Sequence, residues 1–486
     1  MEYLDFIIRI ESRRGEFFVV GIESPAGEGS SELRLPFAPA DVGALLGGVG
    51  HAVRGTREII IRAEQGAAHH HPPTLGDMLF QALFSGPCRD LFNTSLGHIQ
   101  GREIGLRIKL HIDPNDPDLA GLASLPWELM YRAETRDFLS LSRGTPLVRY
   151  LDVQRPFALL PFSPPLRILV AVSSPAGAPP LDLAHERKAI ETTWGKRADV
   201  AVDFLDRVTS RQLTDRLAAR HYHVLHFMGH GDFDPDRGTG VLLLEDDAGQ
   251  PSPIDGATLG MLLRDVASMR LVFLNACNTA RVGSGPGLDP FAGVASALVM
   301  AGVPAVVAMQ FPISDNAAIE FASTFYPRLV EGFPVDAAVA EARKAIRMAD
   351  RKSWEWATPV LFMRSKDGAL FETAAAAGGE EAEGGNTAGG TGARQHALAA
   401  RVQAMQALNA TFAPERYTML ALIIVSALVF LVAAWSLVPS GSAHSAPQAG
   451  IIPVTGASGS AVLFLVSRLL KINERTVAMV REMSAS

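Results

Sequence analysis

Between residues 166 and 363, short apolar segments alternate with segments whose apolar residues recur every three or four positions. The short segments are almost continuously apolar, as in strands buried on both faces, and the others have the period of helices. This order predicts a doubly wound α/β domain with a mostly parallel sheet over residues 163–366. We predict strands at residues 166–172, 200–205, 222–228, 271–276, 305–310 and 359–363, and helices at residues 183–196, 210–220, 257–266, 291–301, 316–331 and 335–348.

Residues 1–155 follow a less regular pattern that mixes strand-like and helical segments. A proline-rich run at residues 155–165 separates this part from the regular alternation, because closely spaced prolines interrupt helices and strand ladders alike. No catalytic motif occurs in this part, which is therefore predicted to be a non-catalytic N-terminal α/β lobe. Its predicted strands are residues 3–10, 17–22 and 104–112, and its predicted helices lie around residues 40–54 and 75–83.

Three consecutive histidines, His69, His70 and His71, lie in this lobe among Gly, Ala and Pro. These neighbours predict a solvated loop. Three adjacent residues do not by themselves give the tetrahedral geometry that zinc requires. We therefore expect no metal at this run, and no cofactor elsewhere in the chain.

The chain changes character after residue 373. Residues 374–394 consist largely of Ala, Gly and Glu and predict a flexible linker, since so few large apolar side chains cannot offset the entropy cost of ordering. Apolar residues at helical spacing then predict a juxtamembrane helix over residues 395–415. Residues 419–438 carry no charge and, at about 1.5 Å per residue, are long enough to cross a hydrocarbon core of roughly 30 Å.

A second apolar run, residues 451–470, is interrupted by Pro453 and is predicted to be a second membrane helix. The loop between the two runs has no Lys or Arg, whereas basic residues flank the outer ends of the runs. This distribution predicts a helical hairpin in the inner membrane, in contact with lipid, with the catalytic domain and both chain ends on the cytoplasmic side. The flanking residues are Arg416 before the first run and Arg468, Lys471, Arg475 and Arg481 at or beyond the end of the second.

Composition narrows the classes of protein further. Hydrophobic residues make up 48% of the chain and charged residues 20%, which excludes wholesale disorder. The net charge of -7 gives no field that would attract nucleic acid, so nucleic acid is not an expected partner. Cys88 and Cys277 cannot form a disulfide framework and fit a reducing compartment. The first residues lack the basic start and apolar core of a secretion signal.

Two of the predicted strands run into side chains suited to covalent catalysis. The strand at residues 222–228 is followed by Gly229, His230 and Gly231, and the strand at residues 271–276 is followed by Cys277. Parallel strands place their carboxyl ends at one edge of a sheet, so we expect His230 and Cys277 to meet there. An imidazole can take the proton of a thiol, and the N–H groups of Gly231 and Cys277 are predicted to face the developing oxyanion.

Other interpretations of these residues are simpler. An isolated cysteine at a strand end is ordinarily a small buried hydrophobic residue, which is the alternative for Cys277. His226 lies four residues before His230, but the segment lacks the glutamate and the helix of a zinc protease motif. The joint occurrence of an imidazole and a thiol at neighbouring strand ends favours a Cys–His dyad over packing or a metal site.

At these residues the sequence resembles the CHAT domain family of caspase-like cysteine peptidases, which are related to separase and named for their association with tetratricopeptide repeats. The resemblance rests on HFMGHG (residues 226–231), LNACNTA (274–280) and AGVPAVVAMQFPISD (301–315). It extends upstream to LPWEL (125–129) and PLVR (146–149), and so covers about residues 105–364.

The resemblance implies that His230 is the general base and Cys277 the nucleophile. The separation of 47 residues between them is close to the roughly 50 of caspases. No repeat of about 34 residues, the length of a tetratricopeptide repeat, occurs in this sequence. A sensing surface would therefore lie on the N-terminal lobe, in the membrane segment or on a separate sensor or activator protein.

We accordingly predict a membrane-anchored cysteine endopeptidase that cleaves a protein partner through an acyl-enzyme on Cys277. Relatives in bacterial defence and programmed cell death imply a substrate such as a pore-forming protein. The alternative is a membrane effector or receptor scaffold in which this domain only binds or signals.

The segment from Phe311 to Asp315 is the predicted substrate pocket. It stands where the family often has Trp-Pro-Val-x-Asp, so Phe311 replaces a tryptophan there. In Arg-specific relatives such as separase an acidic group reads a basic residue before the scissile bond, which implies that Asp315 selects Arg or Lys. The alternative is that Asp315 caps a helix beginning at Asn316, since Asp is favoured at that position.

Overall fold

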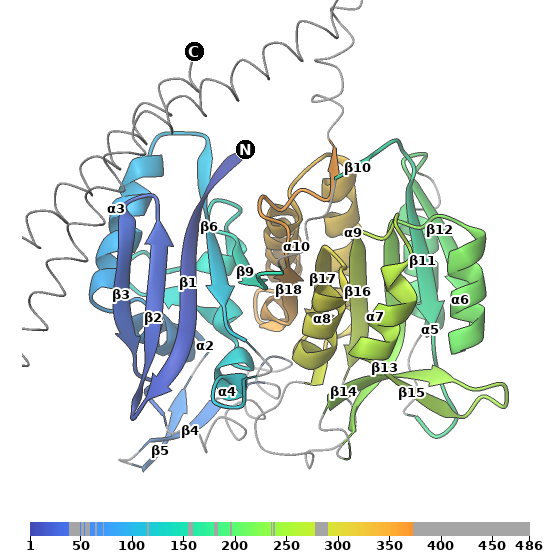
Figure 1. Ribbon diagram of the computed structural model, residues 1–486, viewed down its shortest axis with the longest axis horizontal. Helices are drawn as coiled ribbons and strands as arrows, with labels where there is room; N and C mark the ends of the chain where they lie inside the picture. The colour runs from blue at the N-terminus through green and yellow to red at the C-terminus, as the bar shows by residue number, and fades with distance from the viewer. Residues whose placement is uncertain are drawn as a thin grey trace, which may run out of the picture. The chain divides into compact units, whose positions relative to one another are not determined.

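The computed structural model describes residues 1–372 except 38–48, 50–52, 54–58, 64–65, 71, 114–115, 154–158, 179–182, 195–196, 235, 237–238 and 278–289. One thirteen-stranded sheet runs through this part of the chain (Figure 1). Along its main path the order is β12 (Val200–Leu205), β11 (Leu166–Val172), β13 (Val224–Asp234), β16 (Leu271–Cys277), β17 (Ala305–Met309), β18 (Pro359–Met363), β9 (Leu147–Tyr150), β6 (Ile104–His111), β1 (Glu2–Arg14), β2 (Phe17–Ser24) and β3 (Gly27–Leu33).

The first five strands of this path are parallel to one another, and β18 closes the block antiparallel to β17. Because β11 lies between β12 and β13, the chain winds outward in both directions from it. Alternate residues of each strand face two separate apolar clusters, as in any sheet buried on both faces. The predicted mixed α/β fold with a large, mostly parallel sheet is confirmed.

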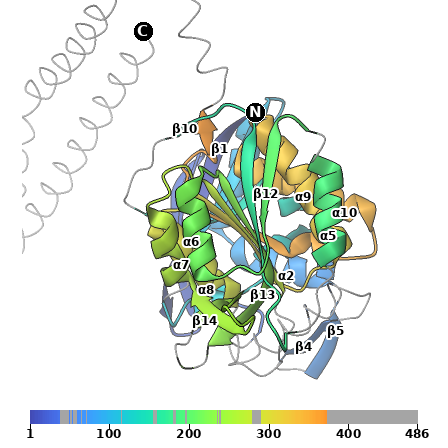
Figure 2. The same cartoon turned by 90° about the vertical axis from the view of Figure 1, so that its right-hand side faces the viewer.

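Helices cover both faces of this block (Figure 2). The first helical layer packs against the cluster that includes Ile168, Val170 and Phe273, and the second against the cluster that includes Leu169 and Leu274. The first layer consists of α5 (Leu183–Trp194), α9 (Asp315–Val330) and α10 (Val335–Ala349), and the second of α6 (Ser210–Ala219), α7 (Gly256–Arg264) and α8 (Pro290–Ala301).

All six strands and six helices predicted between residues 166 and 363 are present, with ends that differ by a few residues. The largest difference is β13, which continues to Asp234 beyond the predicted end at residue 228. Past β11, the extended part of β13 pairs with β14 (Thr239–Glu245), which in turn pairs with β15 (Pro251–Asp255). Neither β14 nor β15 was predicted, although the apolar run from Val241 to Leu244 in β14 was a signal for a strand. The sequence of β15 carries no such signal, because it is partly polar and contains Pro251 and Pro253.

The N-terminal lobe shares this sheet. Strands from both sides of the proline-rich run pair in one sheet: β9 pairs in parallel with β18, β6 with β9, and β1 with β6. Helices α2 (Pro72–Leu83) and α3 (Pro87–Ile99) belong to this part, together with the short helix α4 (Ala120–Ala123) and the 3₁₀ turns η2 (Trp127–Leu129) and η3 (Leu139–Leu141). The predicted helix around residues 40–54 lies almost wholly outside the described residues, and α3 was missed because its sequence is largely polar.

The structure corrects the prediction that the histidine run lies in a loop. His69 and His70 lie in β5 (Gly66–His70), which pairs with β4 (Ile59–Ala63), instead of in a loop. The apolar, β-branched run of β4 offers a ladder that these histidines join. Two further small pairs are β7 (Tyr131–Arg132) with β8 (Asp137–Phe138) and β10 (Leu160–Pro161) with β19 (Phe371–Glu372).

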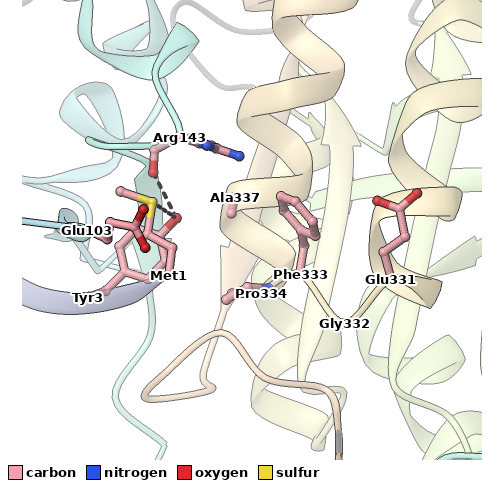
Figure 3. A pocket seen from close by; sticks show the side chains of 9 residues that line it. All are labelled: Met1, Tyr3, Glu103, Arg143, Glu331, Gly332, Phe333, Pro334 and Ala337. Carbon is pink, nitrogen blue, oxygen red and sulfur yellow. Dashed lines mark hydrogen bonds between the residues drawn. The ribbon is translucent and has the colours of Figure 1, made fainter. Parts of the chain in front are cut away.

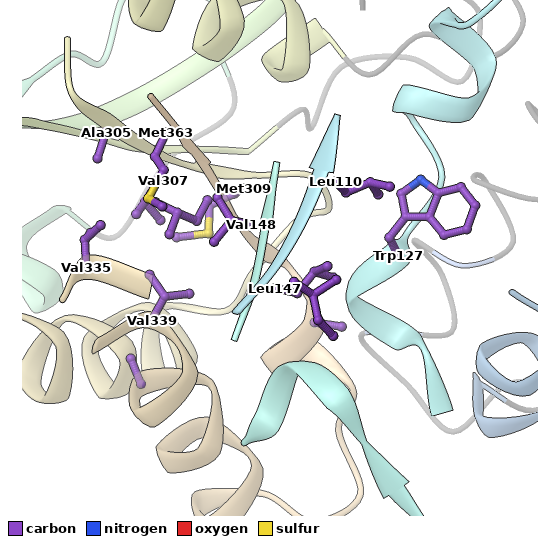
Figure 4. Close-up of a cluster of buried hydrophobic side chains, with 14 of the residues drawn as sticks. Leu110, Trp127, Leu147, Val148, Ala305, Val307, Met309, Val335, Val339 and Met363 are labelled. Carbon is purple, nitrogen blue, oxygen red and sulfur yellow. The ribbon is translucent and has the colours of Figure 1, made fainter. Parts of the chain in front are cut away.

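Apolar side chains from both parts of the chain form one continuous cluster. The cluster includes Leu110 and Val148 of the N-terminal part and Val307, Val339 and Met363 of the remainder, which are labelled in Figure 4. Since these side chains bury one another, the two parts do not present separate cores.

A buried ion pair joins the same two parts. Arg107 on β6 pairs with Asp336 in the first turn of α10, and both side chains are 2% exposed or less. The Arg107 guanidinium also donates to the Asp367 carbonyl at 2.6 Å and pairs with Asp5 at 3.2 Å. Burial alone would lower the pKa of Arg107, but Asp336 and Asp5 raise it above its ordinary value. Gly368 has a positive φ of 73°, and a Cβ there would lie 2.4 Å from the Asp336 carboxylate.

No helix within the described ranges has the length and apolar character needed to cross a membrane. The predicted linker, juxtamembrane helix and both predicted membrane spans lie outside those ranges.

We predict that Arg107→Met lowers the free energy of unfolding by about 3–5 kcal/mol, because it leaves the Asp336 carboxylate buried without its main counter-charge. Urea denaturation measures the change. The control is Arg211→Met, which removes an exposed pair with Asp215 at 4.0 Å and is expected to cost at most about 1 kcal/mol. Equal losses in the two variants would contradict the importance of the buried pair.

Candidate active site

The residues of the predicted dyad stand directly opposite each other in the sheet. Strands β13 and β16 are parallel and in continuous register from Val224 opposite Leu271 to His230 opposite Cys277. Neighbouring strands lie about 4.8 Å apart, and directly opposed residues of a parallel pair are on the same face of the sheet. The register therefore brings together the two positions that the sequence predicted as base and nucleophile.

His230 lies where β13 changes neighbours. Strand β11 pairs with β13 as far as Val172 opposite Met228, and β14 takes its place from Leu243 opposite His230. Ser173 closes the junction, because its N–H donates to the Met228 carbonyl at 2.9 Å and its hydroxyl donates to the Leu243 carbonyl at 2.7 Å. The His230 side chain is 2% exposed between these strands. Such burial shields an imidazole from bulk water.

The two glycines that flank His230 have different surroundings. At Gly229 a Cβ would lie 2.8 Å from the Phe227 ring and 3.0 Å from the Ser173 carbonyl oxygen, so only glycine fits where β11 ends. Gly231 is buried one residue beyond the pair of His230 and Cys277, opposite Leu242 of β14. The oxyanion roles of the Gly231 and Cys277 N–H groups stay predictions.

The nearby His226 is buried among aromatic side chains. Its ring is 1% exposed, 4.5 Å from the ring of Phe273, and its Nδ1 shares a hydrogen bond of 3.1 Å with the Tyr326 hydroxyl. Burial lowers the pKa of His226 to about 3, so the ring is neutral at physiological pH. Tyr326 could not be found from sequence, because it lies 100 residues away on α9. Among the described residues, no three His, Cys, Asp or Glu side chains are grouped as metal ligands.

The predicted pocket segment follows β17. The β16–β17 ladder ends with Leu274 opposite Ala308, and Phe311 follows three residues later, beyond the end of β17. The Phe311 side chain is 6% exposed and packs in the apolar cluster. Asp315 is half-buried in the first turn of α9.

The cap of α9 corrects the alternative interpretation of Asp315. The helix begins at Asp315, and the Ser314 hydroxyl accepts a hydrogen bond of 3.3 Å from the N–H of Ala317. Ser314 is therefore the N-cap residue. The Glu355 carboxylate accepts from the Ser314 N–H at 2.5 Å and from its hydroxyl at 3.0 Å. Glu355 was missed by the sequence reasoning, although an acid between Trp354 and Trp356 was a signal of a buried, partnered carboxylate.

The other cysteine has an environment that suppresses reactivity. Cys88 is fully buried near the start of α3, and burial raises the pKa of its thiol to about 12. A thiol with such a pKa carries almost no thiolate at neutral pH. Cys88 is therefore an unreactive core residue.

A cavity lies away from the predicted dyad. It has a volume of about 380 Å³ and is lined by Tyr3, Arg143 and Phe333 together with residues at the start of α10 (Figure 3). The Tyr3 hydroxyl donates to the Arg143 carbonyl at 2.8 Å across one side of it. None of its lining residues belongs to β13 or β16, so this cavity is not part of the candidate active site.

Comparisons with known proteins relate the chain to one family. The model of the CHAT domain matches residues 74–364. No curated protein matches. Among solved structures, two of the Saccharomyces cerevisiae separase–securin complex, at 2.6 Å and 3.0 Å resolution, are similar at 10% identity, with TM-scores of 0.41 and 0.43. They cover 74% and 75% of this chain, which spans only 30% of the matched chain in each.

The lowered pKa of His226 makes stability depend on pH. An unfolded histidine binds a proton below a pH of about 6.5, whereas folded His226 does so only near 3. As the pH falls from about 6.5 towards 3, the protein should therefore lose stability by up to about 1.4 kcal/mol per pH unit from this group. In His226→Leu the free energy of unfolding should fall less steeply over this pH range, because the contribution of His226 is removed.

Denaturant titrations of both proteins at a series of pH values test this difference. His111 and His223 also have pKa values lowered, mainly by burial, to about 3 and about 4. They contribute equally to both proteins, so the difference in slope isolates His226. Parallel stability curves would show that His226 is protonated in the folded state.

Proposed function

Because the chain belongs to the CHAT domain family, we propose that it is a cysteine endopeptidase in which Cys277 is the nucleophile and His230 the general base. The observation that carries the proposal is the parallel register that sets His230 opposite Cys277. A dyad of this kind needs the thiol and the imidazole within hydrogen-bond reach, and opposed positions on adjacent strands provide such proximity.

The proposed reaction begins with transfer of the Cys277 proton to His230. The thiolate attacks the carbonyl carbon of a peptide bond, and the N–H groups of Gly231 and Cys277 stabilise the oxyanion that forms. The intermediate then breaks its C–N bond, His230 gives its proton to the leaving amine, and a thioester remains on Cys277. Water attacks the thioester with His230 as base, which releases the carboxylic acid and restores the thiol.

The choice of His230 over His226 rests on their surroundings. His226 is held by Tyr326 within the apolar cluster, and its lowered pKa makes it a poor proton acceptor. His230 instead stands at the level of Cys277 where β13 passes beyond β11. Of the two histidines on β13, we therefore assign a structural role to His226 and the role of general base to His230.

The proposal extends to the location of the enzyme. Two long apolar runs with basic flanks support an anchor in the inner membrane, with the catalytic part and both chain ends in the cytoplasm. The substrate would be a protein, such as a pore-forming protein, cleaved after a sensor or activator releases the activity in a defence or cell-death response. The rival is a scaffold in which the domain only binds a partner.

The dyad is tested by Cys277→Ala and His230→Ala. Each should lower peptide cleavage by at least about 10³-fold, because a nucleophile and its base act as a unit and their losses do not add. A peptide-based thiol-reactive probe should label wild-type Cys277 and fail to label Cys277→Ala. The control Cys88→Ala should keep both activities, since the Cys88 thiol is buried. Near-native cleavage by either dyad variant would reject the dyad, and a wild-type protein that cleaves no peptide would support the scaffold.

Specificity is proposed to depend on Asp315, whose carboxylate would attract a basic side chain before the scissile bond. We expect a peptide library to show a preference for Arg or Lys that falls roughly tenfold, or about 1.4 kcal/mol, in Asp315→Asn. The matched control is Glu320→Gln, which removes a half-buried carboxylate further along α9. A basic preference that is unchanged in Asp315→Asn would reject the assignment.

The membrane anchor is tested by deleting residues 414–486. The truncated protein should leave the membrane fraction, keep probe labelling at Cys277 and lose its cellular effect, because confinement near a membrane-bound substrate raises the local concentration. A reporter fused after Ser486 should be cytoplasmic. A membrane-bound truncation or a periplasmic reporter would contradict the hairpin.

A further inference from the structure

A buried carboxylate lies next to the strand that precedes the predicted pocket. Glu128 belongs to η2 and is 1% exposed. Arg149 of β9 binds it with both arms of the guanidinium, through Nε to Oε1 at 3.1 Å and Nη2 to Oε2 at 2.8 Å. Burial alone would raise the pKa of Glu128, but Arg149 and Arg343 lower it, so the carboxylate is ionised. These contacts unite the LPWEL and PLVR segments that the sequence analysis singled out.

Glu128 also binds the end of β17. The Gln310 side chain donates from Nε2 to Glu128 Oε2 at 3.0 Å and to the Ala357 carbonyl at 2.8 Å. The Gln310 backbone N–H donates to the Thr358 carbonyl at 3.0 Å. The residue directly after β17 is therefore attached to three separate groups.

Gln310 lies at the carboxyl end of β17, which pairs with the strand that carries Cys277. The β16–β17 ladder ends with Leu274 opposite Ala308, two residues before Gln310 and three before Cys277. The segment from Phe311 to Asp315 follows at once, and its far end is fixed by the contacts between Ser314 and Glu355. Two buried carboxylates thus hold this short segment, one near each end.

We infer that Glu128 is a positioning residue, which holds Gln310 and through it fixes the segment from Phe311 to Asp315 at the end of β17, the strand next to the one that carries Cys277. An ion pair is not needed here for stability alone, because well-packed apolar residues commonly serve as well at buried positions. What a bidentate ion pair adds is direction, since the carboxylate has one orientation in which Oε2 can also accept from Gln310. The catalytic consequence rests on the proposed peptidase function, whereas the structural consequence does not.

The variant that separates positioning from folding is Gln310→Met. It removes the amide but leaves the pairing of Glu128 with Arg149 intact, in a side chain of similar length. Amide hydrogen exchange of the full-length protein in detergent should rise at least tenfold at residues 311 and 313–315, with no change in β13 and β16. A misplacement of about 1 Å can lower a rate roughly 100-fold, so kcat/KM for peptides should fall 10- to 100-fold. The rate at which iodoacetamide alkylates Cys277 should change less than threefold, because this small reagent does not need to bind the segment from Phe311 to Asp315.

The matched control is Tyr150→Phe, which removes one buried hydrogen bond of 3.2 Å to the Arg364 carbonyl, near the opposite end of β17. It should change neither the exchange at residues 311–315 nor cleavage. Equal effects of Gln310→Met and Tyr150→Phe, or unchanged exchange in Gln310→Met, would overturn the inference. If Gln310→Met fails to fold, Gln310→Ala, whose smaller side chain cannot clash, tests the same attachment with the same measurements. Failure of the peptidase proposal would look different, because the wild-type protein itself would then cleave no peptide. The hydrogen-exchange measurement would still test whether Glu128 positions the segment.

Discussion

The architecture depends on the pairing between β18 and β9. Strand β18 runs antiparallel to β17 and so ends the parallel block, which leaves its outer side free to accept a strand from elsewhere in the chain. Strand β9 accepts that position through a short parallel ladder, in which Phe362 stands opposite Arg149 and Met363 opposite Tyr150. Every strand from β9 to β3 is connected to the block through this one junction. The lobe with no predicted catalytic residue is consequently an extension of the sheet that carries the proposed dyad.

Polar groups concentrate near this junction and in the elements packed around it. Arg149 is itself a residue of the ladder and binds Glu128, while Arg343 of α10 donates to the Pro359 carbonyl at 2.7 Å. Arg107 and Asp336 join β6 to the start of α10. Hydrogen bonds and ion pairs are directional where apolar contacts are not, so they fix the angle and register of a short ladder that packing alone would leave loose. Hydrophobic burial brings the two parts together, and these polar groups determine how they fit.

Sequence patterns predicted the parts of the fold that are determined locally. The strands of the block were recognised because each is apolar on both faces, and His230 and Cys277 were recognised because they follow such strands directly. The partners that orient the site were not accessible in this way. Tyr326 reaches His226, Glu355 reaches Ser314 and Glu128 reaches Gln310 only after folding, and no periodicity encodes contacts between residues 41 to 182 positions apart. The apolar run of β14 was visible locally and was passed over, whereas its pairing with the far end of β13 and with β15 could not be derived from the pattern.

The outer strands of the sheet have a consequence for assembly. Within the described residues, three strands of the thirteen-stranded sheet, β3, β12 and β15, have a partner on one side only. Charged residues lie on the first two, with Glu28 and Glu32 on β3 and Asp203 on β12, and β15 contains Pro251 and Pro253, which lack the N–H that a further strand would need. Such features discourage the stacking of sheets from different molecules edge to edge. The protein can then reach a high local concentration without fibrous self-association while keeping a very wide sheet.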